Sequence, residues 1–291
     1  MIPCRMNPMG SGWPREGSYG VFLTSSGTAV SSAIVMSGAI VSGTDYAQTV
    51  YSHGTARETV VSSGGALSVS SGGITVSATL DGGWNGIYSG GKTISTTLHA
   101  NGRQNVSSGG VTSYSLINAN GRQNVNSGAT VYYTSVNSGG RVDVSSGGRA
   151  VNPVVSSGGT CNLFSGGYLV AENGTVSGHT IISGAYLLVS SGGTAFNADL
   201  AGGWNGVFAG GTAINTTLNS GGRQNVSGGV TTSSIIKAGG RQNVSSGAIV
   251  YNTIISSGGT LTVLSGASAL SVSSQTGAVI VSSAGAYITY A

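Results

Sequence analysis

The chain has 291 residues, of which 52 are glycine and only 6% are charged, and its formal net charge is +4. Typical soluble proteins contain about 7% glycine and about 25% charged residues. Because 39% of the residues are apolar and recur in register, the composition excludes a flexible linker or a charged disordered tail. The basic residues do not cluster, so we expect no nucleic-acid partner. Two cysteines cannot form a disulfide framework.

No targeting or membrane segment is recognisable in this sequence. The first ten residues contain no apolar stretch of the kind found in signal peptides, so we expect none here. No apolar run reaches the roughly 20 residues of a membrane helix. We therefore expect no membrane insertion by this chain.

The amino-terminal part differs from the rest in composition. Residues 1–20 hold three of the four prolines, and we expect them to form a non-repeat leader. Residues 21–60 contain degenerate Ser-Gly steps, which indicate an irregular start of a repeat domain spanning 21–291.

A repeated segment dominates the remainder of the chain. The sequence RQNVSSGG begins at Arg103, and close copies begin at Arg122, Arg223 and Arg241, with the variant RVDVSSGG at Arg141. Neighbouring copies follow one another at a step of about 19 residues, and a fixed period of this size indicates one structural unit stacked on copies of itself. Glycine pairs end a short and a long arm in each unit, because glycine supplies the positive φ that tight turns require.

Two apolar columns follow the same period. The first column contains Ile87, Val106, Val125, Val144, Leu163, Val207, Val226, Val244 and Val263. The second column contains Leu80, Leu98, Ile117, Val136, Val155, Leu200, Leu218, Ile236 and Ile255. We expect both columns to face the core.

A longer repeat lies on top of this period. Residues 68–131 resemble residues 188–250. Between these halves the frame breaks, and an extra short arm begins at Tyr168. We expect a kink or loop near 168–184.

The arms favour strands over helices. They are short, and they are rich in Val, Ile, Thr, Tyr and Ser, which suit β-structure. One unit per turn predicts an all-β, right-handed parallel β-helix, a solenoid with rungs of about 19 residues. In this fold Val106 faces inward, so Gln104 faces inward too, and it is placed to bond with glutamine on the next rung.

Catalytic signals are weak. The chain has seven carboxylates, and only Asp45 and Glu58, near His53, suggest a cluster. The histidines are scattered, and the glycine-pair loops lack the aspartates of calcium-binding repeats, so we expect no metal and no cofactor. Cys161 falls in the column of Gln104 and is interpreted as a small buried side chain.

The outward column gives the one candidate binding surface. Arginines that stack about 5 Å apart repel, so they must splay into solvent or meet an acidic partner. The alternative interpretation is a solvated face on which arginine prevents edge pairing. We expect substitution of the arginines by serine to leave the fold intact. The candidate ligand or self-association residues are Trp84, Arg103, Asn105, Arg122, Asn124, Arg141, Trp204, Arg223, Asn225 and Arg241.

The repeat form Asn-Ser-Gly-Gly-Arg-Gln-Asn-Val-Ser-Gly-Gly at 219–229, together with Thr-Thr-Ser arms, resembles the repeats of AIDA-type autotransporter adhesin passengers. The resemblance covers roughly residues 60–270. It implies a right-handed β-helical passenger at a bacterial surface that mediates adhesion, autoaggregation and biofilm growth. It also implies heptose on serine or threonine, for example Ser107, Ser108, Ser145 or Ser146. The signal peptide and the exporting β-barrel of that family have no recognisable counterpart here.

We therefore expect a non-catalytic surface adhesin that binds copies of itself, surface glycans or host receptors through the side of the β-helix. The alternative is a β-helical carbohydrate-active enzyme, or a polysaccharide depolymerase like those of phage tail spikes. That enzyme needs paired carboxylates on one face.

Overall fold

The computed structural model describes residues 28–30, 35–37, 40–41, 47–51, 53–70 and 72–291. The leader expected at 1–20 lies outside these residues, as does part of the irregular segment 21–60. The described residues form only strands, turns and bends, and the strands pair in parallel from one rung to the next. None of them lies in a helix that is long and apolar enough to span a membrane. The predicted all-β parallel solenoid is confirmed.

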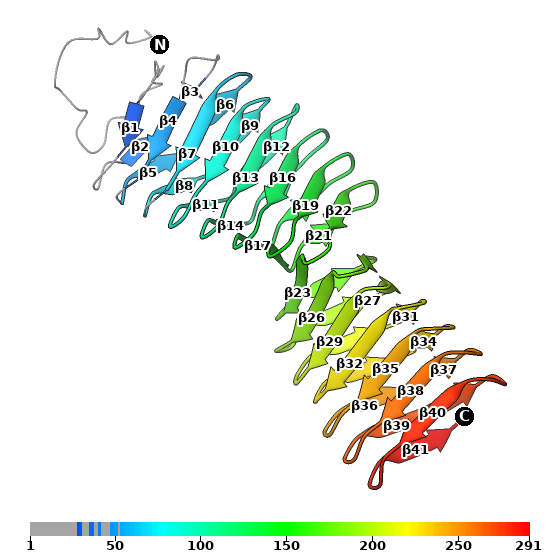
Figure 1. The fold of residues 1–291 in the computed structure, drawn as a ribbon. Helices are drawn as coiled ribbons and strands as arrows, with labels where there is room; N and C mark the ends of the chain where they lie inside the picture. Colours follow the sequence, from blue (N-terminus) through cyan, green and yellow to red (C-terminus); the bar gives the residue numbers. More distant parts are fainter. Residues whose placement is uncertain (1–27, 31–34, 38–39, 42–46, 52, 71) are drawn as a thin grey trace, which may run out of the picture. The chain divides into compact units, whose positions relative to one another are not determined.

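The chain divides into two compact units, which are described separately. Unit 1 contains residues up to Asp143 together with Val155–Asn162, and unit 2 contains Val144–Val154 and Leu163–Ala291. In each unit a rung consists of three short strands, and strands in the same position of successive rungs lie side by side (Figure 1). We call these positions rows A, B and C.

Unit 1 carries its rows on strands of two to four residues, and strands that the unit boundary divides are described with unit 1. Row A is an eight-stranded parallel sheet made of β1 (Thr28–Val30), β4 (Ala47–Val50), β7 (Ala66–Val69), β10 (Trp84–Ile87), β13 (Arg103–Val106), β16 (Arg122–Val125), β19 (Arg141–Val144) and β22 (Thr160–Leu163). Row B contains β2 (Val35–Ser37), β5 (Thr55–Arg57), β8 (Ile74–Val76), β11 (Lys92–Ile94), β14 (Val111–Ser113) and β17 (Thr130–Tyr132). Row C contains β3 (Ile40–Val41), β6 (Val60–Ser62), β9 (Thr79–Asp81), β12 (Thr97–His99), β15 (Leu116–Ile117), β18 (Ser135–Val136) and β21 (Val154–Val155).

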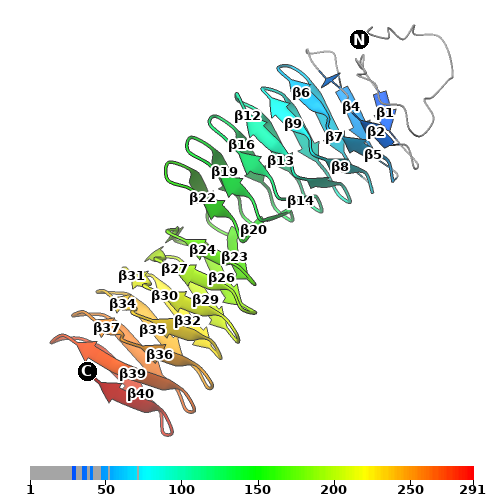
Figure 2. The ribbon, with the colours of Figure 1, turned by 180° about the vertical axis from the view of Figure 1, so that it is seen from behind.

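Unit 2 repeats the arrangement (Figure 2). Its row A contains β20 (Arg149–Val151), β23 (Tyr168–Glu172), β26 (Tyr186–Ser190), β29 (Trp204–Phe208), β32 (Arg223–Ser227), β35 (Arg241–Val244), β38 (Thr260–Val263) and β40 (Val279–Ser282). Row B contains β24 (Thr175–Ser177), β27 (Thr194–Phe196), β30 (Thr212–Ile214), β33 (Val230–Thr232) and β36 (Ile249–Tyr251). Row C contains β25 (Thr180–Ile182), β28 (Asp199–Ala201), β31 (Thr217–Leu218), β34 (Ile235–Ile236) and β37 (Ile254–Ile255). The long strand β39 (Ser268–Ser274) pairs with both β36 and β37, and β41 (Tyr287–Tyr290) pairs with β39. The stretch in which we expected a kink or loop, 168–184, contains β23, β24 and β25.

The glycine pair between rows A and B is needed for two different reasons. Gly109 has a φ of +74°, a conformation that side chains with a Cβ rarely adopt. Gly110 has an ordinary φ, but a Cβ there would lie 2.7 Å from the carbonyl oxygen of Ile87 on the preceding rung. The first glycine therefore makes the turn, and the second allows successive rungs to pack closely.

In the described residues the corner between rows B and C contains no glycine except Gly178, between β24 and β25, whereas we expected glycine to mark the turns. At these corners two residues separate the strands, and the first of them has a positive φ, such as Tyr114 (φ 57°) and Tyr133 (φ 50°) in unit 1 or Asn215 (φ 55°) in unit 2. Asparagine tolerates this left-handed conformation better than most residues. This corner divides each predicted long arm into two strands.

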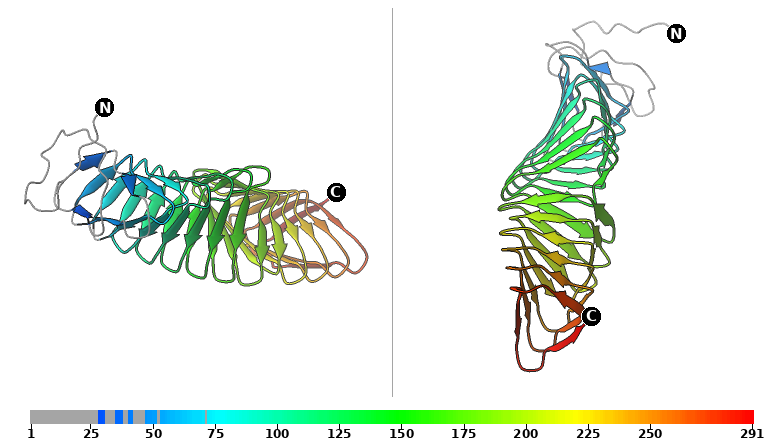
Figure 3. Two further views of the ribbon diagram at one scale, coloured as in Figure 1. Left: turned by 90° about the horizontal axis from the view of Figure 1, so that it is seen from above. Right: turned by 90° about the vertical axis from the view of Figure 1, so that its right-hand side faces the viewer.

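The predicted core columns line the interior, and Figure 3 shows the rungs following one another in side view. Every residue of the two columns is buried except Val155, which is half-buried. Val155 lies on β21, the last strand of its row in unit 1, so it has a neighbouring strand on one side only. The prediction that Val155 is a buried core residue was therefore only partly correct. Its side chain stays half-exposed because no further strand of this row covers one side of β21.

Glutamines inside each unit form the predicted amide ladder. In unit 1 the Nε2 of Gln123 donates to the Oε1 of Gln104 over 2.6 Å, and Gln104 donates to the Oδ1 of Asn85 over 3.0 Å. In unit 2 Gln242 donates to Gln224 over 2.6 Å, and Gln224 donates to Asn205 over 2.7 Å. All these side chains are fully buried, so their bonds replace the lost contacts with water.

Candidate binding surface

The first strip lies on the outward face of row A in unit 1. It consists of Trp84, Arg103, Arg122 and Arg141 at the start of β10, β13, β16 and β19. Trp84 pairs in register with Arg103, and Arg103 with Arg122. The alternation along each strand buries Gln104 and Val106 and turns Arg103 toward solvent, as predicted.

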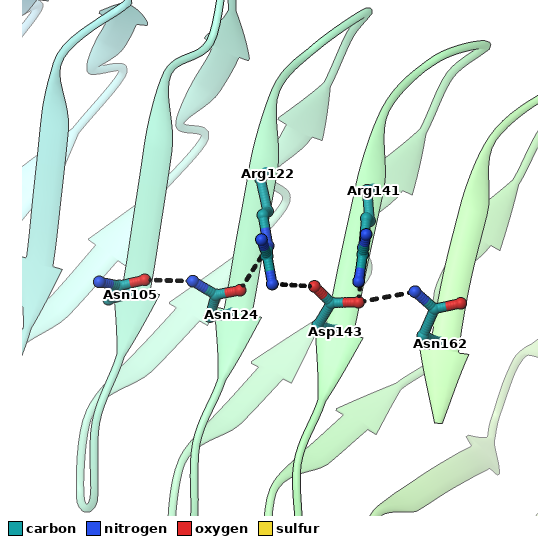
Figure 4. Close-up of polar contacts among 6 residues, drawn as sticks. All are labelled: Asn105, Arg122, Asn124, Arg141, Asp143 and Asn162. Atoms are coloured by element: carbon teal, nitrogen blue, oxygen red, sulfur yellow. Dashed lines mark hydrogen bonds and ion pairs between the residues drawn. The ribbon is translucent and has the colours of Figure 1, made fainter. Parts of the chain in front are cut away.

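A polar network runs beside the first strip (Figure 4). Asn124 donates its Nδ2 to the Oδ1 of Asn105 over 2.5 Å, and Arg122 donates its Nε to the Oδ1 of Asn124 over 2.9 Å. The Nη2 of Arg122 lies 2.6 Å from the Oδ2 of Asp143, and Arg141 donates its Nε to the Oδ1 of Asp143 over 2.7 Å. Asn162 also donates to that oxygen over 2.7 Å.

The network resolves the repulsion between stacked arginines by supplying an acidic partner. The side chain of Asp143 is only 4% exposed, whereas those of Arg122 and Arg141 are 40% and 44% exposed. A carboxylate that is buried must be paired, because isolated burial of its charge is costly. This changes our expectation that the arginines are freely replaceable: Arg122 and Arg141 hold a buried charge, whereas Arg103 has no ion-pair partner among the described residues.

The second strip lies on the outward face of row A in unit 2. The predicted residues Trp204, Arg223 and Arg241 pair in register on β29, β32 and β35. Beside them the Nδ2 of Asn243 donates to the Oδ1 of Asn225 over 3.0 Å. The next strand, β38, carries Thr262 in register with Asn243, so no carboxylate occupies this position.

Three residues that the sequence analysis did not assign to a site extend the second strip. On the amino-terminal side of Trp204 the register continues to Tyr186, Tyr168 and Arg149. These residues follow one another at the repeat step, which was visible in the sequence. They were missed because they lie between the copies of the repeat that begin at Arg141 and Arg223, partly in the stretch interpreted as a kink or loop. We define the second strip as Arg149, Tyr168, Tyr186, Trp204, Arg223 and Arg241.

Two hollows lie at corresponding places on the strips. In unit 1 a hollow of about 490 Å³ is lined by Trp84, Arg103, Ala66, Asn101 and the glycines of adjacent turns. In unit 2 a hollow of about 730 Å³ is lined by Trp204, Arg223, Tyr186, the serines Ser183 and Ser220, and adjacent small turn residues. Each hollow therefore combines an aromatic ring with an arginine.

Two carboxylates among the described residues have partners of their own. In the part of the chain that the structure describes, no three His, Cys, Asp or Glu side chains are arranged to hold a metal ion. Asp81 pairs with His99 over 3.4 Å, and Asp143 is occupied by two arginines. Asp45, one member of the suggested cluster, lies outside the described residues.

Two further titratable groups are kept uncharged by their surroundings. Cys161, interpreted above as buried, is half-buried. Desolvation first and the Asp143 carboxylate second raise the pKa of its thiol to about 12, so the thiol is protonated at neutral pH and is a poor nucleophile. Burial lowers the pKa of His179 from 6.5 to about 4, which leaves this side chain neutral inside unit 2.

The chain is similar to several solved structures. No family model and no curated protein matches the chain. One solved structure is the TibC-catalysed hyper-glycosylated fragment of TibA, which spans residues 55 to 350 of that protein. Its sequence is 34% identical to that of this chain. The alignment covers 90% of this chain and 94% of the fragment, with a TM-score of 0.47. The sequence identity over this length is the deciding observation.

The chain belongs to the AIDA-type autotransporter adhesin passengers. The repeat form at 219–229 had indicated the same family.

Proposed function

We propose that the chain is a non-catalytic adhesive module of a bacterial cell surface. In this proposal the passenger makes its contacts through the outward strips of row A, with copies of itself, surface glycans or host receptors as partners, and contributes to adhesion, autoaggregation and biofilm growth. The supporting observation is that tryptophan and arginine stand in register on adjacent exposed strands of both units. Tryptophan and arginine are enriched among the residues that dominate binding energy at interfaces.

The test is an adhesion assay with the purified chain coupled to beads. We expect the coated beads to clump or to adhere to cells, and we expect a combined Arg103→Ser, Arg223→Ser and Arg241→Ser variant to adhere less. These three arginines were chosen because none of them pairs with Asp143. An unchanged unfolding midpoint checks that the variant is folded. Beads that neither clump nor adhere with the unaltered chain would overturn the proposal.

We also propose that turn serines accept sugars, as the TibA fragment does in the presence of TibC. Ser108 and Ser146 are exposed at turns that follow row A strands. Co-expression with TibC followed by intact-mass measurement tests this. We expect added sugar masses that decrease when Ser108 and Ser146 are replaced by alanine, and an unchanged mass of the unaltered chain would contradict it.

A further inference from the structure

The second strip is a continuous column of large side chains along unit 2. Six successive strands of row A, from β20 to β35, each contribute the residue at the same register position. Neighbouring strands of a sheet lie about 4.8 Å apart, so the column extends over roughly 24 Å. Such a column suits a ligand that is itself extended and repetitive.

The centre of the column is aromatic. The rings of Tyr168 and Tyr186 stack with their centroids 4.9 Å apart and 14° between their planes. The ring of Trp204 meets that of Tyr186 edge-on, at 5.9 Å and 67°. Residue 206 must be small, because a Cβ on Gly206 would lie 2.5 Å from an atom of the Trp204 ring. Because residue 206 has no side chain, the Trp204 ring can lie over its own strand β29.

The ends of the column are cationic. The guanidinium of Arg149 lies 5.8 Å from the centre of the Tyr168 ring, and Arg223 and Arg241 follow Trp204. Unit 2 is described in full, and in it no carboxylate forms an ion pair with any of these three arginines. Its two carboxylates lie elsewhere, Glu172 at the far end of β23 and Asp199 on β28, where Asn219 donates to it. The charge of the column is therefore available to a ligand.

The hollow of unit 2 combines the aromatic rings and the cationic groups of the second strip. Tyr186, Trp204 and Arg223 line it together, and its remaining walls are serine, alanine and glycine. An apolar ring face beside a forked donor suits a sugar ring that carries a carboxylate or sulfate, because arginine binds such groups through two parallel hydrogen bonds. The corresponding hollow of unit 1 has Ala66 in register with Trp84, whereas unit 2 has Tyr186 in register with Trp204.

We propose that the second strip binds an extended acidic polysaccharide. The acidic group of one sugar lies against Arg223, and its ring lies in the hollow beside Trp204 and Tyr186. Further acidic sugars along the same chain meet Arg241 in one direction and Arg149 in the other. A second copy of this strip is disfavoured as the partner, because it would bring arginine against arginine. This inference rests on the proposed adhesive function and names the ligand class of one of its surfaces.

The test is titration of the full chain with a hyaluronan oligosaccharide, in which acidic and uncharged sugars alternate. The control ligand is the same oligosaccharide with its carboxylates reduced to alcohols. We expect binding of the acidic form, weakened by added salt, and little binding of the reduced form. Equal binding of both forms, or no binding of the acidic form, would overturn the proposal.

Matched variants of the two units locate the site. Trp204→Ala with Arg223→Ser should weaken binding about tenfold or more, whereas Trp84→Ala with Arg103→Ser should change it less than about twofold. Arg223→Ser alone, at an exposed position, covers the case in which the Trp204 variant fails to fold. Equal losses in the two units would contradict the assignment to unit 2. Stronger competition by single-stranded oligothymidylate would also contradict it, because the strip would then be a general polyanion surface.

The bead assay separates this inference from the proposed function. If beads carrying the unaltered chain adhere while the oligosaccharide does not bind, only the polysaccharide inference fails. If the oligosaccharide binds but the beads never adhere or clump, the adhesive function fails and the ligand class stands. If the unit 2 variant abolishes self-association of the chain in sedimentation while the oligosaccharide is inert, the strip contacts a second copy and the polysaccharide inference is wrong.

Discussion

The two units use the same repeat to build the same interior and different exteriors. In both, the RQNV strands bury glutamine and valine, and the glutamines bond along the stack. Outside, unit 1 pairs two of its arginines with the buried Asp143, whereas unit 2 has threonine at the corresponding position and leaves its arginines without an ion-pair partner. Unit 2 also continues its strip through Tyr186 and Tyr168, where unit 1 has Ala66 and Ala47. The interior thus maintains the fold while the outward positions set the surface chemistry.

The largest difference in stability between the two units is expected when the arginines that pair with Asp143 are replaced. Replacing both Arg122 and Arg141 by serine leaves a buried carboxylate without a cation, which should lower the free energy of unfolding by about 3 to 5 kcal/mol. The matched change in unit 2, Arg223→Ser with Arg241→Ser, should cost less than about 0.5 kcal/mol, because no buried charge depends on these residues. Denaturant unfolding measures both. Adding Asp143→Asn to the unit 1 variant should restore part of the lost stability. Equal losses of stability in the two units would contradict the role given to Asp143.

A pH-dependent effect is expected from His179 in unit 2. The pKa of His179 is about 4 in the folded chain, against 6.5 for an unperturbed histidine. The unfolded state therefore binds more protons between these values, and the free energy of unfolding should fall as the pH drops from about 6.5 toward about 4, by on the order of 3 kcal/mol.

The matched control for this pH effect comes from unit 1. There the residue immediately before the row C strand β6 is Thr59, which is buried and cannot titrate in this range. Unfolding of His179→Thr should show a much smaller loss of stability between pH 6.5 and pH 4. An unchanged pH profile in this variant would assign the effect to other groups.

A smaller effect, equal in both units, tests the shared interior. Gln104→Ala removes the acceptor of Gln123 and the donor to Asn85, and Gln224→Ala does the same to Gln242 and Asn205. Each change leaves buried polar atoms unsatisfied, so each should cost about 2 kcal/mol or more. Unfolding midpoints of the two variants should shift together. A shift in one unit only would mean that the ladders are not equivalent.

Much of the fold could be predicted because each copy of the repeat corresponds to one rung of the solenoid. The regular repeat step, together with the alternation of side chains along a strand, placed Val106 and Gln104 inside and Arg103 outside, and all three positions are confirmed. The corner at Tyr114 and Tyr133 could not be predicted in the same way, because the chain adopts a left-handed conformation there without the glycine that usually marks it.

The surfaces were harder to predict because they depend on single residues. The pairing of Asp143 with Arg122 joins neighbouring strands, and it depends on one aspartate at a position where the adjacent repeat has Asn124. The aromatic part of the second strip was missed because Tyr168 opens a rung whose strands no longer match the RQNV pattern. Its register with Tyr186, one repeat step further along the chain, was the signal that could have revealed it.

The most direct measurement of the central difference is bead adhesion of two matched variants tested side by side. Trp204→Ala with Arg223→Ser alters the second strip, and Trp84→Ala with Arg103→Ser alters the first. The account predicts that the unit 2 variant loses most of its adhesion while the unit 1 variant retains most of it, with both still folded. Equal retention, or a larger loss in the unit 1 variant, would contradict the claim that the unpaired arginines and stacked rings of unit 2 make the contact.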